Sequence, residues 1–381
     1  MTATLERFKV LIAGGGVAGL EGALALHDLA GDRIELKLVS PNHEFVYRPM
    51  SVREPFAYGQ AQRYQLREIA QDVGVELLDD AFASVEPAVR TAHTASGARL
   101  RYDALLLGLG AHVRPRYEHA VTIDDRRLDE LLHGLILDIE GGYVQRLAFV
   151  APAPIAWPLP IYELAMMTAQ RAFDMNVEVA ITILTPEDSP LAVFGQGASE
   201  ATSQLLADSG IEVISGVYCE IPRSGLIEIC PGERRLEVDR IVALPQLEGP
   251  AVDGLPAAPD GFIPIDVHCQ VRDTERVYAA GDATDFAIKY GGIAAQQADT
   301  AAQAIAALAG AAVTPEPFEP VIHGVLLTGA APRYLNAQIT GGHGISSELT
   351  AEPTFSPPAK IAAKYLAPYL EQLDRSPERS Q

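Results

Sequence analysis

Three glycines near the start of the chain have the spacing of a phosphate-binding turn. Gly14, Gly16 and Gly19 follow the apolar run Lys9 to Ala13 and precede a helical pattern. The first glycine permits a sharp exit from the strand, the second lets phosphates approach the backbone, and the third lets the helix pack closely. N–H groups of the first helical turn, including that of Ala18, would face the phosphates. The spacing therefore predicts that the turn binds a dinucleotide through its pyrophosphate.

The end of the next predicted strand departs from the usual NAD pattern. About 20 residues after the glycine turn, an acidic side chain normally binds the ribose hydroxyls. Ser40 occupies that position here. Serine can still hydrogen-bond a ribose, so we expect Ser40 to contact the cofactor, but its presence argues against a standard NAD site.

Two further strand–turn signals recur later in the chain. Residues 101–110 read as a strand that ends in a turn containing Gly108 and Gly110, and residues 276–282 read as a strand that ends in Gly281 and Asp282. In this order and spacing, the three pieces resemble the FAD-dependent pyridine nucleotide–disulfide oxidoreductase superfamily over residues 8–310. The resemblance implies that Gly108 and Gly110 close over FAD, and that Asp282 binds its ribityl or pyrophosphate region.

Within that superfamily the chain is most similar to sulfide:quinone reductases and flavocytochrome c sulfide dehydrogenases, and less closely to type II NADH dehydrogenases. The segment 45–49, with Arg48 and Pro49, looks like the one that reaches the flavin ring. The stretch 289–298 looks like the approach to a helix aimed at the pyrimidine edge of the flavin, with Gly292, Ile293 and Ala294 at its start. The resemblance implies that the N–H groups of Ile293 and Ala294 stabilise negative charge there.

Strand-like and helix-like segments alternate along most of the 381 residues. This alternation predicts an α/β fold: two Rossmann-like, doubly wound, three-layer domains of the glutathione-reductase type, with a small C-terminal α+β segment. We expect an FAD-binding domain in two parts, a second Rossmann-like domain with a degenerate nucleotide site, and terminal strands followed by a helix. The expected bounds are 1–112 and 255–322 for the first domain, 113–254 for the second, and 323–381 for the C-terminal segment.

The second predicted strand–loop–helix unit lacks the glycines that a nicotinamide dinucleotide would need. Residues 150–165 contain four prolines and Trp157. Proline removes the N–H donors that a pyrophosphate would use. Ordinary NAD(P)H binding is therefore disfavoured. Two interpretations of this loop stay open: it only packs, or Trp157 walls the flavin and shapes a different substrate pocket.

The candidates for catalysis in this chain are few. Cys219, Cys230 and Cys269 lie away from the expected flavin side, so buried structural roles are favoured over the thiolate chemistry of sulfide:quinone reductases. Glu163 matches a flavin-proximal glutamate of type II NADH dehydrogenases, with Lys289 approaching from the other side. It is either a proton relay or a helix-dipole partner.

Composition limits the partners. With 29 basic and 50 acidic residues the net charge is −21, which makes nucleic acid an unsuitable partner. The nine histidines form no metal-ligand spacing. The absence of a secretory signal or transmembrane run predicts a cytoplasmic protein. An apolar stripe in residues 358–373 has three open roles: peripheral contact with the inner face of the membrane, a dimer contact, or packing on the protein body.

The favoured function is an FAD-dependent oxidoreductase of the sulfide:quinone reductase-like group. An unidentified two-electron donor would reduce the flavin without the usual catalytic cysteines, and a quinone or another small-molecule acceptor would reoxidise it. The alternatives are an NAD(P)H:quinone-type dehydrogenase and a low-turnover flavoprotein that acts as a binding or scaffold module.

Overall fold

The computed structural model describes residues 7–340 and 343–375. Its first domain is built on a five-stranded parallel sheet with the strand order β20-β9-β1-β2-β5. These strands are Val277–Ala279, Ala104–Leu107, Phe8–Ala13, Ile34–Ser40 and Glu76–Asp79, respectively. The four residues of β9 are all buried, as expected for a parallel strand covered on both faces.

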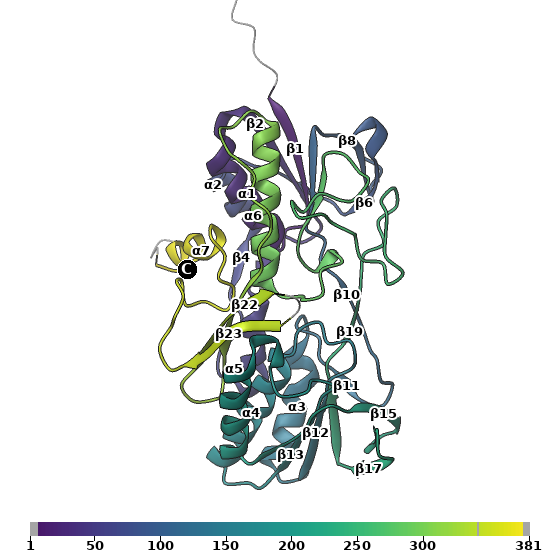
Figure 1. Ribbon diagram of the computed structural model, residues 1–381, viewed down its shortest axis with the longest axis vertical. Helices are drawn as coiled ribbons and strands as arrows, with labels where there is room; N and C mark the ends of the chain where they lie inside the picture. Colours follow the sequence, from purple (N-terminus) through teal and green to yellow (C-terminus); the bar gives the residue numbers. More distant parts are fainter. Residues whose placement is uncertain (1–6, 341–342, 376–381) are drawn as a thin grey trace, which may run out of the picture.

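Helices and a small antiparallel sheet cover the two faces of this sheet. On one side α1 (Val17–Ala30) and α6 (Gly291–Leu308) pack along each other, with α2 (Leu66–Asp72) nearby (Figure 1). On the other side lie β6 (Phe82–Glu86), β7 (Thr91–Thr94) and β8 (Arg99–Arg101). The short strands β3 (Glu44–Val46) and β4 (Arg63–Gln65) form a ribbon at the edge.

The second domain repeats this plan. Its parallel sheet has the order β11-β18-β12-β13-β14 and carries three helices. The strands are Val121–Thr122, Arg240–Ala243, Arg146–Val150, Ala180–Leu184 and Ile211–Ile214, and the helices are α3 (Leu128–Glu140), α4 (Leu159–Asp174) and α5 (Gln196–Asp208). A three-stranded antiparallel sheet contains β15 (Tyr218–Arg223), β16 (Leu226–Cys230) and β17 (Arg234–Glu237). The predicted fold class is confirmed.

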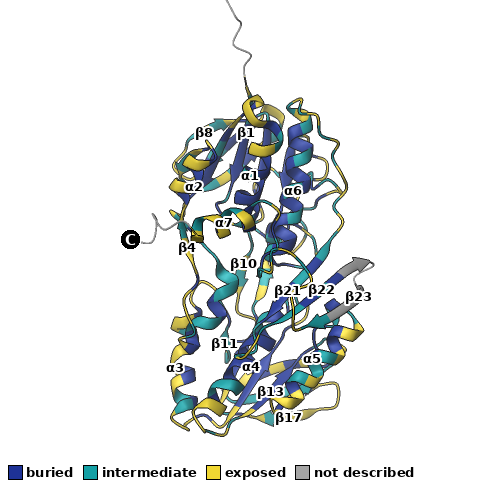
Figure 2. Ribbon diagram, turned by 90° about the vertical axis from the view of Figure 1, so that its left-hand side faces the viewer, coloured by how far each residue is buried: buried dark blue, intermediate teal, exposed yellow. Residues whose placement is uncertain are grey.

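The chain crosses between the domains twice, at β10 (His112–Arg114) and β19 (Gln246–Glu248). These two strands pair antiparallel, so the outgoing and returning connections lie side by side. Buried residues concentrate along the strands and inner helix faces of both domains (Figure 2).

The C-terminal segment consists of three antiparallel strands and one helix: β21 (Val321–Leu326), β22 (Arg333–Thr340), β23 (His343–Thr350) and α7 (Leu366–Arg375). The sequence predicts helix from Pro357, but the helix begins nine residues later. The buried carboxylate of Glu21 on α1 accepts hydrogen bonds from the N–H groups of Tyr365 (2.9 Å) and Leu366 (2.5 Å). A side chain from another helix therefore supplies the partners that the start of α7 lacks.

Candidate active site

A cavity of about 760 Å³ opens where the glycine turns of the first domain face the proline-rich loop of the second. That volume suits a large cofactor, since such sites typically measure about 300–1,000 Å³. The predicted site residues that line it are Gly14, Gly16, Ala18, Arg48, Pro49, Gly108, Gly110, Trp157, Gly281, Asp282, Lys289 and Ala294. The cavity is not lined by the other predicted site residues, which are Ser40, Glu163, Gly19, Gly292 and Ile293.

The first glycine turn is shaped by two close backbone approaches and one open position. A Cβ at Gly14, where φ is +108°, would lie 2.2 Å from the carbonyl oxygen of Gly108, and one at Gly19 would lie 1.8 Å from that of Gly14. A Cβ at Gly16 would meet no protein atom within 4 Å. The N–H of Leu20 makes the first bond of α1, to Gly16, so the preceding N–H groups are available to an anion.

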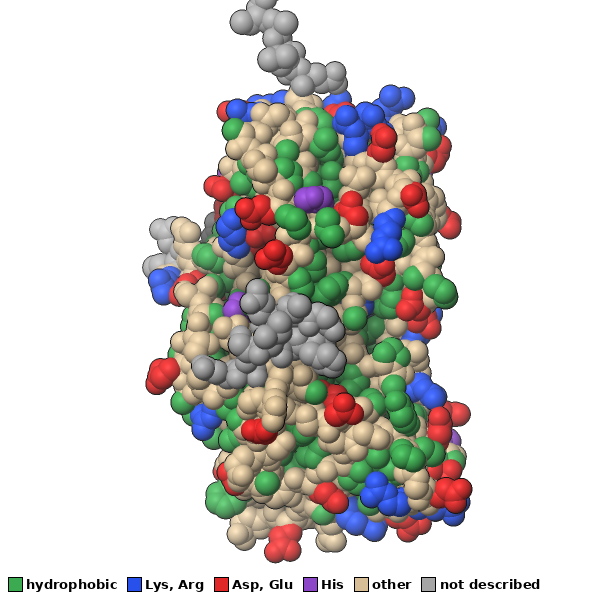
Figure 3. Space-filling model, in the orientation of Figure 1, with side chains coloured by type: hydrophobic (Ala, Val, Ile, Leu, Met, Phe, Trp, Pro, Cys, Tyr) green, Lys and Arg blue, Asp and Glu red, His purple; other side chains and the backbone are tan. Residues whose placement is uncertain are grey.

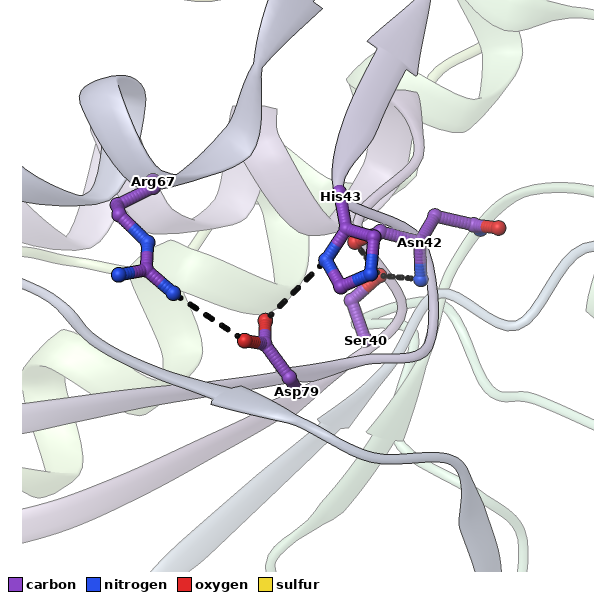
Figure 4. Close-up of polar contacts among 5 residues, drawn as sticks. All are labelled: Ser40, Asn42, His43, Arg67 and Asp79. Carbon is purple, nitrogen blue, oxygen red and sulfur yellow. Dashed lines mark hydrogen bonds and ion pairs between the residues drawn. The ribbon is translucent and has the colours of Figure 1, made fainter.

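Ser40 does not reach the cavity. Its hydroxyl turns back onto Asn42, accepting from the backbone N–H at 3.1 Å and donating to the carbonyl oxygen at 3.3 Å (Figure 4). Asp79, at the end of the neighbouring strand β5, is engaged by Arg67 at 3.3 Å and His43 at 3.8 Å. Asn42 itself lines the cavity, so of these two residues Asn42, and not Ser40, can meet a ligand there.

The charged residues that line the cavity include Arg48, Asp125, Asp282 and Lys289. Arg48 lies 3.3 Å from Asp125, and Asp282 interacts with Lys289. Burial raises the pKa of Asp282 to about 6, although the Lys289 charge opposes the shift. Within the described residues, no donor to the Asp282 carboxyl group is present. This carboxylate can therefore accept a hydrogen bond from a ligand hydroxyl.

Asp125 was missed by sequence reasoning, although a signal existed. It follows β11 closely, and the carboxyl ends of parallel strands are where ligands bind in open α/β sheets.

Lys289 belongs to a loop of the first domain, just before α6, that contacts the second domain. Its backbone N–H bonds the carbonyl of Ala156 at 3.0 Å, and its ammonium donates to the carbonyl of Thr284 and lies 3.8 Å from the centre of the Phe262 ring. Burial lowers the pKa of Lys289 to about 8, with Asp282 opposing. With this lowered pKa, the Lys289 amine can hold or release a proton near neutral pH.

Trp157 is stacked against the start of α6. Its ring lies 4.4 Å from that of Tyr290 at an interplanar angle of 14°, and 5.6 Å from that of Phe194. The indole is half-buried and lines the cavity. Trp157 therefore packs against neighbouring rings and also lines the cavity.

The start of α6 differs from the expectation. The N–H of Ala294 is already bonded to the carbonyl of Tyr290 at 3.0 Å, so it cannot serve a ligand as predicted. The N–H groups that precede the first helical bond are those of Gly291, Gly292 and Ile293. Of the predicted pair, Ile293 alone keeps a donor for a negatively charged group.

Glu163 is held in a buried ion pair outside the cavity. Its carboxylate lies 2.5 Å from the ammonium of Lys360 and accepts the N–H of Leu327 at 2.8 Å. Burial raises the pKa of Glu163 and lowers that of Lys360, and each charge opposes the shift of the other. Lys360, and not Lys289 as predicted, approaches Glu163. The neighbouring Ile361 lines the cavity, so this pair fixes one part of its wall.

The cysteines lie away from the cavity. Cys219 and Cys269 are buried, which raises the pKa of both thiols, that of Cys219 to about 12. Cys230 is exposed, which corrects the prediction that all three are buried. The part of the chain that the structure describes contains no cluster of three or more His, Cys, Asp or Glu residues able to hold a metal.

Part of the chain matches a known protein family. The family model described as "Pyridine nucleotide-disulphide oxidoreductase" matches residues 162–307. The match covers less than half of the 381 residues. This match confirms the predicted resemblance and the prediction of an oxidoreductase.

Individual relatives are more distant. An NADH dehydrogenase-like protein of Mycobacterium tuberculosis is 24% identical over 298 residues, 72% of each chain. The sulfide:quinone oxidoreductase of Aquifex aeolicus is similar in structure over 91% of this chain and 87% of its own, with a TM-score of 0.79 and 17% identity. A ferredoxin reductase of Rhodopseudomonas palustris is similar over 88% and 83%, with a TM-score of 0.68 and 19% identity. At these identities the structural likeness establishes the fold.

None of the helices in residues 7–340 and 343–375 combines the length and apolar character needed to span a membrane.

Proposed function

We propose that the protein is an FAD-dependent oxidoreductase whose cofactor lies in the large cavity. The observation that carries this proposal is the convergence there of the first glycine turn, the Gly281–Asp282 turn and Arg48. When bound, FAD supplies two-electron transfer between a donor and an acceptor. The N–H groups at the start of α1 would hold the pyrophosphate, and Asp282 would accept from a hydroxyl of the ribityl chain.

The charged groups suit a site that handles protons. Lys289 lines the cavity, and its lowered pKa lets it hold or release a proton near neutral pH. Asp282, whose pKa is about 6, lies within range of the same ammonium. We assign Lys289 as the proton donor on the cavity wall and Asp282 as the group that positions the cofactor. Glu163 acts through Lys360 as a positioning residue.

We further propose that the electron donor is a small molecule other than NAD(P)H, and that a quinone or another small acceptor reoxidises the flavin. The loop that would bind a nicotinamide dinucleotide contains Pro152, Pro154 and Pro158, so it lacks the required donors. Trp157 stacks on Tyr290 beside it. All three cysteines lie outside the cavity lining, which argues against a thiolate nucleophile at the flavin.

A second candidate is an NAD(P)H dehydrogenase, which the NADH dehydrogenase-like relative favours. An anaerobic screen separates the candidates by following the flavin absorbance after addition of NADH, NADPH, sulfide or a thiol. We expect sulfide or a thiol to bleach the band and the nicotinamides to leave it unchanged for minutes. Bleaching by NADH within seconds would establish the second candidate, and reduction by dithionite alone would indicate a binding or scaffold module.

A further inference from the structure

A second cleft lies at the edge of the first sheet opposite the large cavity. Its charged lining residues are Arg7, Lys9, Arg33, Arg90, Arg101 and Arg276, with Asp32 and Asp103. Figure 3 shows Lys and Arg side chains gathered at the end of the molecule where β1 begins. Six basic groups around one cleft contrast with the net charge of −21 of the whole chain. We name this feature the basic cleft.

The basic cleft is separate from the proposed cofactor site. The residues that line the basic cleft lie where β1, β9 and β20 begin. The residues that line the large cavity follow the ends of the same strands. The six residues of β1 span about 20 Å at roughly 3.3 Å per residue, which sets the distance between the two edges. Ligands of open α/β sheets bind at the carboxyl ends of strands, so the cofactor does not explain this cluster.

Several cations in the cleft lack a counterion. Within the described residues, no acidic side chain pairs with Arg33, Arg90 or Arg101. Arg7 lies 3.9 Å from Asp32, and both side chains are exposed, so this contact is weak.

The other groups of the cleft bind one another. The carboxylate of Asp103 accepts the backbone N–H of Lys9 at 2.8 Å. Arg276 lies 3.5 Å from the carbonyl oxygen of Asp103 and stands over the Phe8 ring at 5.9 Å. The local charge is strongly positive even after Asp32 and Asp103 are counted.

Tyr102 supplies an independent sign of a ligand. Tyr102 is among the residues that line the basic cleft and is 3% exposed, yet its hydroxyl has no hydrogen-bond partner among the described residues. A buried hydroxyl without a partner is costly. The backbone N–H of Tyr102 donates to the carbonyl oxygen of Arg90 at 3.1 Å, so the two residues lie side by side in the lining of the cleft.

We propose that the basic cleft binds a small molecule that carries a diphosphate group, with Arg90 and Arg101 pairing the phosphates and the Tyr102 hydroxyl donating to a phosphate oxygen. Guanidinium groups match phosphate oxygens in a bidentate manner, and two adjacent phosphates carry the charge density that several arginines require. Val89 and Leu308 line the same cleft with 55% and 43% exposure, so an organic portion of the ligand can rest on them.

Calorimetric titration of the purified full-length protein, with and without added FAD, tests this proposal. The probes are inorganic pyrophosphate, ADP, and citrate as a polycarboxylate control. We expect pyrophosphate to bind one saturable site and citrate to bind at least tenfold more weakly. Tighter binding of ADP than of pyrophosphate would identify a nucleotide as the source of the diphosphate, and equal binding would identify the free anion.

Variants distinguish a specific binding site in the basic cleft from general electrostatic attraction of an anion to the protein. Arg90→Gln and Arg101→Gln should each weaken pyrophosphate binding about tenfold, the loss expected of one charge-assisted hydrogen bond. Arg234→Gln removes an exposed arginine on β17 in the second domain and should leave binding unchanged. Equal affinity in the native protein and both cleft variants would overturn the proposal.

Tyr102→Phe distinguishes a role of this hydroxyl in ligand binding from a purely structural role. Because the hydroxyl has no protein partner, its removal should not lower the unfolding temperature in the absence of pyrophosphate. The same variant should bind pyrophosphate several-fold more weakly. Unchanged binding, or a lowered unfolding temperature without ligand, would contradict the assignment of this hydroxyl.

Discussion

At the scale of single residues, Gly16 separates folding from cofactor binding. Because a Cβ there meets no protein atom within 4 Å, Gly16→Ala should leave the unfolding temperature nearly unchanged. The added methyl group would occupy the space that the phosphates need, so we expect FAD affinity to fall at least tenfold. Gly134→Ala on α3 is the matched control, since its Cβ also meets open space but lies far from the cavity. Equal FAD affinity in both variants would remove Gly16 from the site.

Glu163 and Lys360 allow a second test at this scale. Glu163→Leu leaves a buried ammonium without its partner, so we expect a loss of about 3–5 kcal/mol in the free energy of unfolding. Removing both charges in Glu163→Leu/Lys360→Met should cost less, about 1–3 kcal/mol, because mainly the Leu327 N–H is then left unpaired. Urea unfolding is measured for the native protein, Glu163→Leu, Lys360→Met and the double variant. A double variant that loses the sum of the two single losses would refute the coupling.

At the scale of elements, the docking of α7 depends on Glu21. Burial raises the pKa of Glu21 from 4.5 to about 7, so the folded state holds a proton that the unfolded chain releases between these values. Stability contributed by this group is therefore complete below pH 4.5 and is lost as the pH rises to about 7. This rise in the pKa of Glu21 corresponds to about 3 kcal/mol.

Glu21→Gln should remove this dependence. The free energy of unfolding of the variant, relative to that of the native protein, should rise by about 3 kcal/mol between pH 4.5 and pH 7.5. The control is Glu35→Gln, which changes an exposed residue of β2. Parallel pH profiles for native protein and Glu21→Gln, measured by urea unfolding, would show that Glu21 does not control the docking of α7.

The C-terminal stripe also belongs to this scale. Ile361, Leu366 and Leu370 are buried in the core of the first domain, and the hydroxyl of Tyr369 bonds Asp72 at 2.8 Å. Packing on the protein body therefore accounts for the apolar pattern in residues 358–373. The sequence showed the stripe but not its partner, because the partner, α1, lies more than 300 residues earlier in the chain.

At the scale of the whole molecule, local signals predicted the architecture well. Glycine turns after buried strands located both the first sheet and the large cavity, because each such turn must stand at the carboxyl edge of a parallel sheet. The specific side-chain partners could not be predicted from the sequence. Nothing near Glu163 indicates Lys360, and nothing near Ser40 shows that its hydroxyl closes onto Asn42 instead of a ligand. Cys230 is exposed although it ends β16, the central strand of its three-stranded sheet, and its sequence neighbours do not reveal this placement.

The central claim is that one FAD occupies the cavity between the two domains. Its most direct test is to purify the full-length protein, denature it, and quantify the released flavin against protein concentration. We predict a yellow protein that releases FAD at about one molecule per chain, and a clearly lower ratio for Gly16→Ala than for Gly134→Ala. A colourless protein that releases no flavin and takes up none when incubated with FAD would contradict the account.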